Sequence, residues 1–276
     1  MTPHESSRRP AAALDNRKQA VFSSSPWSPV FIVFACALSA CGRVPGQFEI
    51  VQNQVPTPDC TIDTNEGIYR GDGTADLSLV QPGARAAYLV FPLLKNNLPA
   101  STGGGPDGNA IAVNSFAVDI GESKFGALPP NVKGLFDTLN GAAKDSSDYA
   151  LLHYSLPWAA NLSSGGGLAA SRVAAFPVEL AARVLATGDV GVSRTSMVVN
   201  VRIRAFGSTN TQNLESDPFD YPVFVCSGCL VANVLACPYK GPPANLGNPC
   251  NVSQDNYVDC CSLNGQLICP PVVSAQ

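Results

Sequence analysis

The chain has 276 residues, of which 45% are hydrophobic and 14% are charged, and its formal net charge is −4. This length is sufficient for a hydrophobic core in one large domain or two smaller ones. The excess of acidic residues argues against nucleic acid and against anionic membrane surfaces as binding partners.

The N-terminal segment combines basic residues with a short apolar run. Four Lys or Arg residues precede residue 30, and residues 30–37 are mostly apolar and end at the tetrapeptide Leu38-Ser39-Ala40-Cys41. The apolar run is too short to cross a bilayer as a helix, and this order of features is typical of a cleaved targeting segment. The sequence therefore predicts that residues 1–40 form a signal peptide.

The tetrapeptide ending at Cys41 resembles the lipobox of bacterial lipoprotein signal peptides. The resemblance implies that Cys41 receives a diacylglyceryl group, becomes the first mature residue and attaches the protein to a membrane through this lipid anchor. Gly42, in place of an aspartate, implies sorting to the outer membrane. The alternative is an ordinary secretory signal that is cut after Ala40 and leaves Cys41 as a plain thiol.

Cleavage before Cys41 defines three mature regions. It leaves 13 Lys and Arg residues against 19 Asp and Glu residues, a net charge of −6. Residues 41–60 are polar and rich in proline, which predicts a lipidated tether with an extended reach of roughly 60 Å. Residues 61–225 are predicted to form the body, and residues 226–276 a disulfide-rich C-terminal segment.

The body reads as short strands separated by glycine, proline and asparagine. The turn sequence Gln81-Pro82-Gly83 predicts a hairpin between its two flanking apolar runs. The alternation of Val199, Val201 and Ile203 with polar residues predicts a strand with one solvated face. The predicted strands are 75–80, 86–94, 111–120, 150–156, 197–206 and 220–225.

Helical patterns are fewer. Residues 178–185 follow Pro177 and precede Gly188, which suits one short helix, and residues 132–139 suggest a second after Pro129-Pro130. Regularly spaced strands without a βαβ rhythm favour an antiparallel β-sandwich, immunoglobulin-like or similar. The predicted fold is thus mainly β, with one or two short helices and a disulfide-rich C-terminal segment.

Cysteine parity predicts a bridge across the whole mature chain. Eight cysteines follow Cys41, and outside the cytosol such a density normally means disulfides. Seven of the eight lie after residue 225, so complete pairing requires one of these seven to reach Cys60. The pairing itself stays open, although neighbouring cysteines such as Cys260 and Cys261 are disfavoured as partners. The candidates are Cys60, Cys226, Cys229, Cys237, Cys250, Cys260, Cys261 and Cys269.

The Cys226-Ser-Gly-Cys229 spacing also occurs in zinc sites and in redox-active dithiols. No second C-x-x-C and no histidine pair follows at ligand spacing, and the residues before Cys226 predict a strand rather than a helix. A structural disulfide is therefore favoured over a metal or redox site, and no metal or cofactor is expected.

Catalytic motifs are scarce. His153 is the one histidine after the predicted signal peptide, and its apolar neighbours indicate a half-buried strand residue. Asp217 with Asp220, or Asp72 with Asp76, could form a carboxylate pair of the kind that glycoside hydrolases use. Residues 72–76 lack the alternating oxygen donors of a calcium loop. The sequence thus predicts a protein that is not an enzyme.

Three stretches near the C-terminus are distinctive, namely residues 219–230, 247–250 and 259–261. Together with the signal peptide, these last sixty residues resemble uncharacterised envelope lipoproteins of myxobacteria. We therefore predict a structural or interaction module that binds another envelope protein or an extracellular polymer. The alternatives are an envelope hydrolase that uses a carboxylate pair and a small-ligand-binding lipoprotein, which a large apolar pocket would favour.

Overall fold

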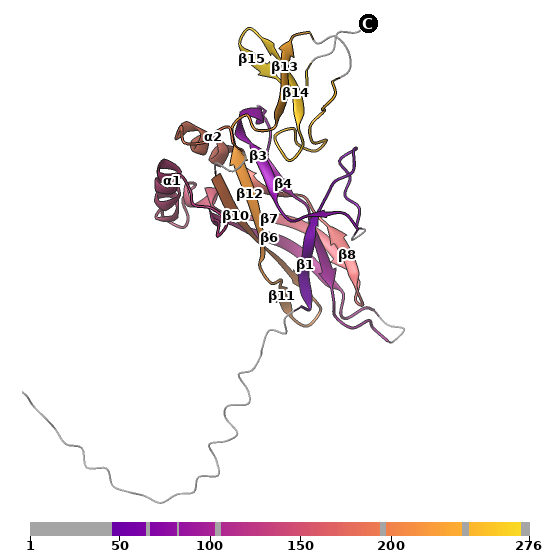
Figure 1. The fold of residues 1–276 in the computed structure, drawn as a ribbon. Helices are drawn as coiled ribbons and strands as arrows, with labels where there is room; N and C mark the ends of the chain where they lie inside the picture. Colours follow the sequence, from indigo (N-terminus) through magenta and orange to yellow (C-terminus); the bar gives the residue numbers. More distant parts are fainter. Residues whose placement is uncertain are drawn as a thin grey trace, which may run out of the picture. The chain divides into compact units, whose positions relative to one another are not determined.

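The computed structural model describes residues 46–64, 67–81, 83–102, 106–193, 197–238 and 243–271 (Figure 1). The predicted signal peptide and Cys41 lie outside these residues. The fold is mainly β with two α-helices, which confirms the predicted fold class. No helix in the described ranges combines the length and apolar character needed to cross a membrane.

The largest sheet contains the strands that the sequence patterns predicted best. Its strand order is β3-β12-β10-β6-β7, and β11 pairs with β10. The pairs are antiparallel except for β3, which runs parallel to β12. The bounds are β3 Gly73–Asp76, β6 Ile111–Glu122, β7 His153–Leu162, β10 Met197–Ser208, β11 Asn213–Glu215 and β12 Phe219–Cys226.

Alternation along β10 shows why this sheet has one buried face. Val199, Val201 and Ile203 are fully buried, whereas Arg202 between them is exposed. Strand β6 alternates in the same way on both sides of a bulge between Val113 and Ser115, where the buried positions shift by one residue. The sheet therefore buries an aliphatic face and presents a charged face to solvent.

A second layer covers this apolar face. It contains a four-stranded sheet of order β2-β1-β5-β8 and the separate pair β4-β9. Phe48 and Leu94 of the four-stranded sheet share one core cluster with the buried residues of β6, β10 and β12. The bounds are β1 Phe48–Gln54, β2 Tyr69–Arg70, β4 Ala86–Val90, β5 Pro92–Asn96, β8 Gly167–Ala170 and β9 Val173–Pro177.

Both predicted helices are present. Helix α1 spans Pro130–Asn140 and helix α2 spans Val178–Ala186. Proline at or just before the first turn starts each helix, where the missing N–H costs nothing. Each buries one apolar face in the main core, for example Phe136 from α1 and Leu180 from α2. Two 3₁₀ turns, Leu77–Leu79 and Tyr149–Leu151, complete the body.

Residues that the sequence analysis assigned to a tether form strand β1 instead. β1 lies between β2 and β5, and its Phe48 and Ile50 are buried. The polar Asn53 is also buried, where its side-chain oxygen accepts a 2.7 Å hydrogen bond from the N–H of Phe91. The sequence of β1 resembles a linker because polar side chains such as that of Asn53, which hydrogen-bonds to a buried backbone group, break the apolar pattern. The body therefore begins at β1, before residue 61.

The predicted hairpin around Gln81 is also wrong. β3 ends at Asp76, whose side chain accepts a 3.0 Å hydrogen bond from the N–H of Ser78 and starts the 3₁₀ turn. β3 then pairs with β12, whereas β4 pairs with β9 and β5 pairs with β1. The capping by Asp76 ends the strand before a hairpin can form.

The C-terminal segment, residues 226–271, carries a small sheet of order β13-β14-β15, with β13 parallel to β14. The bounds are β13 Val231–Ala236, β14 Val258–Leu263 and β15 Gln266–Ile268. All eight cysteines that the sequence predicted to pair form four disulfides. The pairs are Cys60–Cys250, Cys226–Cys229, Cys237–Cys261 and Cys260–Cys269. The predicted link from Cys60 to the C-terminal cysteines is therefore formed by Cys250.

Candidate functional site

Residues 251–256 of the C-terminal segment run alongside the body and form hydrogen bonds with its backbone N–H and carbonyl groups. The carbonyl oxygen of Ser253 accepts a 2.8 Å hydrogen bond from the N–H of Asp76. The side-chain amide of Gln254 accepts from the N–H of Leu89 at 2.9 Å and donates to the carbonyl of Leu89 at 3.3 Å. This stretch therefore holds the segment against β3 and β4.

Asp255, in the same stretch, accepts hydrogen bonds from the buried hydroxyl of Tyr88. The hydroxyl of Tyr88 lies 3.1 and 3.2 Å from the two carboxylate oxygens of Asp255, and 3.1 Å from the hydroxyl of Tyr221. Burial, followed by the negative charge of Asp255, raises the pKa of Tyr88 well above its usual value. Tyr88 thus stays protonated at neutral pH and can donate to Asp255.

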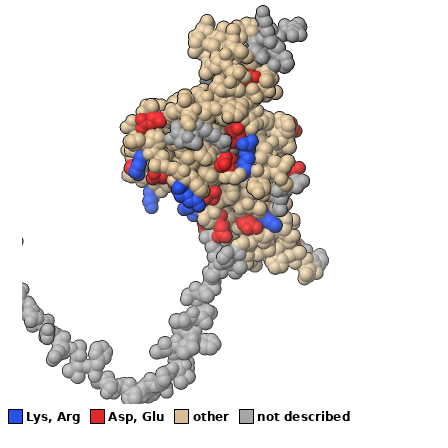
Figure 2. All heavy atoms as spheres, in the orientation of Figure 1, with Lys and Arg blue, Asp and Glu red and all other residues tan. Residues whose placement is uncertain are grey.

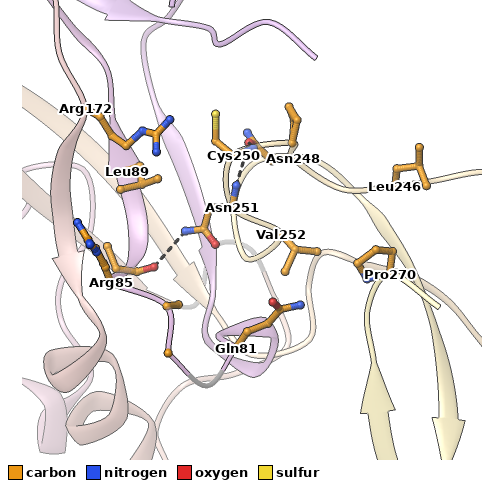
Figure 3. A pocket seen from close by; sticks show the side chains of 14 residues that line it. Gln81, Arg85, Leu89, Arg172, Leu246, Asn248, Cys250, Asn251, Val252 and Pro270 are labelled. Atoms are coloured by element: carbon orange, nitrogen blue, oxygen red, sulfur yellow. Dashed lines mark hydrogen bonds between the residues drawn. The ribbon is translucent and has the colours of Figure 1, made fainter. Parts of the chain in front are cut away.

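A pocket opens beside this contact, between the body and the C-terminal segment (Figure 3). Its volume is about 670 Å³, which lies within the range of small-molecule sites. The body contributes Arg85, Leu89 and Arg172, and the C-terminal segment contributes the loop 246–252 and Pro270. We call this site the arginine pocket.

The two arginines of this pocket differ from the other arginines that the structure describes. Four of the six described arginines form ion pairs with carboxylates, at Arg70, Arg183, Arg202 and Arg204. Arg85 and Arg172 form no ion pair with any described carboxylate, and no Asp or Glu is among the described residues that line the pocket. Figure 2 shows the opposite on the visible face of the body, where acidic and basic side chains intermingle.

The long-range disulfide positions one of these arginines. Nη2 of Arg172 lies 2.9 Å from Sγ of Cys60 and 3.4 Å from the carbonyl oxygen of Cys60. Cys60 is bonded to Cys250, which itself lines the pocket. The bridge therefore links Cys250 of the pocket lining to Cys60, whose sulfur and carbonyl oxygen contact the guanidinium of Arg172.

The outward face of the large sheet carries a row of alternating charges. His153, Asp119, Arg202 and Asp220 are successive register partners across β7, β6, β10 and β12. Nδ1 of His153 lies 2.8 Å from Asp119, and Arg202 makes hydrogen bonds of 2.8 and 3.0 Å to Asp220. The charges of Asp119, Arg202 and Asp220 partly neutralise one another on a solvated face.

His153 and Asp119 have the geometry of the base and the orienting acid of a hydrolytic triad. Nε2 of His153, however, lies 2.8 Å from the side-chain oxygen of Asn140, which takes the position that a nucleophile's hydroxyl or thiol would need. The imidazole is half-buried at the start of β7 and stacks on Tyr149. Its partners give it a structural role in the sheet.

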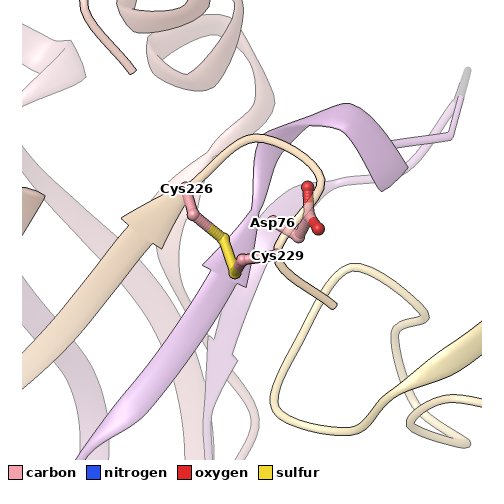
Figure 4. A group of neighbouring side chains, drawn as sticks. All are labelled: Asp76, Cys226 and Cys229. Atoms are coloured by element: carbon pink, nitrogen blue, oxygen red, sulfur yellow. A yellow bond between two sulfur atoms is a disulfide. The ribbon is translucent and has the colours of Figure 1, made fainter. Parts of the chain in front are cut away.

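Asp76, Cys226 and Cys229 lie within 4.8 Å of one another through their possible ligand atoms (Figure 4). The two sulfur atoms form a disulfide, so they are not the thiolates that bind zinc. The carboxylate of Asp76 accepts hydrogen bonds from the N–H groups of Gly228 at 2.7 Å and Leu230 at 2.8 Å. This group stabilises the turn after β12.

Neither predicted carboxylate pair reaches the arginine pocket. Asp76 bonds backbone N–H groups, and its proposed partner Asp72 does not line the pocket. Asp220 is paired with Arg202, and Asp217 does not line the pocket either. Arg85 and Arg172 were not predicted as site residues, and the one sequence signal that pointed to this region was the predicted bridge between Cys60 and a C-terminal cysteine.

Comparisons with protein-family models, with curated proteins and with solved structures found no match to this chain. The site is therefore interpreted from its own geometry.

Proposed function

We propose that this protein is a cell-envelope lipoprotein that acts as a binding module without catalytic activity, and that the arginine pocket is its binding site. The observation that carries the proposal is the pocket itself, with two guanidinium groups that form no ion pair with a described carboxylate and a lining residue, Cys250, that a disulfide holds. A rigid concave site with a few directed polar groups is the usual form of a ligand site.

The arrangement of polar side chains supports binding rather than hydrolysis. A glycosidase needs two carboxyl groups that face each other across the substrate. The arginine pocket is lined instead by basic, amide and apolar side chains among the described residues. A small-ligand-binding lipoprotein is the second candidate, and the 670 Å³ volume of the pocket favours it.

Blocking the pocket tests the proposed site. Leu246 lines the pocket and is 66% exposed, so Leu246→Trp places bulk at the pocket without disturbing the core. Leu267 is 47% exposed and is not among the residues that line the pocket, so Leu267→Trp is the matched control. We expect cross-linking in intact envelopes to capture a protein or polymer with the parent and with Leu267→Trp, and much less of it with Leu246→Trp. Equal capture by both variants, or no reproducible capture by the parent, would refute the proposal.

The envelope location rests on the lipobox-like tetrapeptide and on the disulfides. We propose that Cys41 carries the lipid, that the body faces away from the cytoplasm and that the outer membrane is the destination. β1 begins at Phe48, seven residues after Cys41, so an extended linker would span at most about 25 Å. The anchored body would then stay much closer to the lipid than a tether reaching residue 60 would allow.

Two cysteine variants test this location. Cys41→Ser should abolish incorporation of labelled fatty acid and release the protein from membranes. Cys36→Ser, in the preceding apolar run, is the matched control and should retain both properties. Membrane retention and labelling of Cys41→Ser would contradict the anchor, and separation of inner from outer membranes would identify the destination.

A further inference from the structure

We infer that the arginine pocket binds a segment of an acidic glycan through carboxylate groups on separate sugar units. This inference rests on the proposed function, because it names the ligand class of the same site. The first support is the charge pattern. Arg85 and Arg172 are the two described arginines without a carboxylate partner, and both line one pocket that contains no described acidic side chain.

Guanidinium groups suit this ligand. Their planar N–H groups match the geometry of a carboxylate, and such charge-assisted hydrogen bonds are stronger than neutral ones. The whole chain has a net charge of −4, so its surface as a whole repels polyanions. The pocket is a local exception to this repulsion. An anion is therefore expected to bind where the positive charges of Arg85 and Arg172 lie.

The two arginines are separated along the β4-β9 pair. Arg85 directly precedes β4 and Arg172 directly precedes β9, and the strands are antiparallel, with Ala86 opposite Pro177 and Val90 opposite Val173. The two arginines therefore lie at opposite ends of a strand pair whose β4 strand is roughly 16 Å long. A ligand with carboxylates repeated along a chain can contact both arginines, whereas a single carboxylate engages one end more easily than both.

The backbone of β4 disfavours an acidic peptide as the ligand. Peptides commonly bind by adding a strand to free backbone groups. Here Gln254 occupies the N–H and carbonyl of Leu89, and Asn251 donates to the carbonyls of Ala86 at 3.1 Å and Ala87 at 3.2 Å. These strand-pairing groups are already taken, so recognition must come from side chains.

The remaining lining suits sugar rings. Leu89, Leu246 and Val252 offer apolar contacts for C–H faces. The side-chain N–H of Gln81 donates to the carbonyl of Cys269 at 2.9 Å. This contact fixes the orientation of the Gln81 amide, whose oxygen can accept a hydrogen bond from a sugar hydroxyl. Ring faces, hydroxyls and carboxylates are the three groups that a uronic acid presents together.

Binding of tetragalacturonate by the oxidised full-length protein in detergent tests the inference. Calorimetry should show binding of tetragalacturonate, weaker binding of monomeric galacturonate and no binding of the fully methyl-esterified tetramer. The Nε–Hε signals of Arg85 and Arg172 in NMR spectra should shift with the acid and not with the ester. Higher salt should weaken the interaction, because the attraction is between charges.

Three variants identify the residues. Arg85→Gln and Arg172→Gln should each reduce the affinity for tetragalacturonate about tenfold, the size expected for one charge-assisted contact. Arg183→Gln is the matched control, because Arg183 pairs with Asp148 on the surface and does not line the pocket. It should leave the affinity unchanged, and thermal unfolding should verify that all three variants are folded.

Several outcomes would overturn the inference. Equal binding of the acid and the ester, equal affinity of all three variants, or no binding of tetragalacturonate would each do so. Tighter binding of poly-glutamate would assign the pocket to an acidic polypeptide, and monomer binding as tight as tetramer binding would assign it to a small acid. If the inference fails while Leu246→Trp still blocks capture in envelopes, the proposed function stands and only the ligand class is wrong.

Discussion

The hydroxyl of Tyr88 lies within hydrogen-bonding distance of both carboxylate oxygens of Asp255, at 3.1 and 3.2 Å. Tyr88 belongs to β4 of the body and is completely buried, and Asp255 belongs to the C-terminal segment. The side chain of Asp255 is 5% exposed and also accepts a 3.0 Å hydrogen bond from the N–H of Thr74. One buried polar contact thus connects the two parts that enclose the arginine pocket.

Tyr88→Phe should lower the free energy of unfolding by about 1–3 kcal/mol, because a buried carboxylate loses a donor. Tyr257→Phe is the matched control. Tyr257 is 62% exposed, and its change should stay within about 0.5 kcal/mol. Urea unfolding of both variants measures the difference, and equal stabilities would show that the Tyr88–Asp255 contact contributes nothing.

Alkaline pH should destabilise the protein through the same phenol. The pKa of Tyr88 is raised in the folded protein by burial and then by Asp255, whereas in the unfolded chain it returns to about 10. Above pH 10 the unfolded state therefore loses a proton that the folded state keeps, and Tyr88 alone lowers the free energy of unfolding by up to about 1.4 kcal/mol per pH unit. Tyr154 and Tyr221, whose pKa values are also raised by burial, add to this fall. Tyr88→Phe should remove this part of the pH dependence between pH 9 and 11, and an unchanged slope would contradict the shift.

Gly73→Ala should disrupt the packing of Tyr88. A Cβ atom at Gly73 would lie 2.1 Å from the Tyr88 hydroxyl oxygen and 2.2 Å from its ring, too close for any side-chain rotation to relieve cheaply. Overpacking of this kind typically costs about 1–3 kcal/mol. Gly71→Ala, where no atom lies within 4 Å, is the control and should leave the thermal midpoint nearly unchanged.

Removal of the Cys60–Cys250 disulfide should cost more than removal of Cys260–Cys269. The first bond closes a sequence separation of 190 residues and the second a separation of 9. In the chain-entropy model the losses are about 5 and about 2.6 kcal/mol. Double serine variants of each pair, compared by chemical denaturation, test the order. The Cys60/Cys250 variant should in addition weaken tetragalacturonate binding, because Arg172 loses its contact with Cys60.

Acid should weaken the C-terminal segment at Asp259. Hydrogen bonds from the side chains of Asn245 and Asn233 lower the pKa of Asp259 from 3.8 to about 2. A lowered pKa means that the folded state holds this proton less tightly than the unfolded state, so the stabilisation is present above pH 4 and is lost as the pH falls toward 2. The stability difference between the parent and Asp259→Asn should shrink over this interval, and a constant difference would contradict the shift.

The sequence predicted the elements whose burial is regular. β10, β12 and both helices follow from apolar periodicity and from proline at the helix starts. Strand β1 was missed because Asn53 is polar and yet buried. The N–H of Phe91, which donates a hydrogen bond to the Asn53 side chain, lies 38 residues away in the sequence. The hairpin after Asp76 was wrong because a side-chain cap overrode the turn sequence. Both errors arise from side-chain hydrogen bonds, which the apolar periodicity of the sequence does not reveal.

The candidate site was less accessible to sequence reasoning. Cysteine parity correctly required a bridge from Cys60 to the C-terminal cysteines, which already implied that distant parts of the chain meet there. It could not indicate that Arg85 and Arg172 line the same pocket as Cys250, because 86 residues separate the two arginines in the sequence and each resembles a surface arginine. The absence of a partner carboxylate among the described residues is a property of the folded arrangement.

The side-chain amide of Gln254 has a consequence for solubility. An open strand edge is a place where foreign chains can add and seed aggregates. At Leu89 the side chain of Gln254 bonds both the backbone N–H and the backbone carbonyl, so these groups cannot pair with a strand of another molecule. Resistance to templated assembly therefore depends on the docked C-terminal segment, and molecules that release it would expose β4 to self-association.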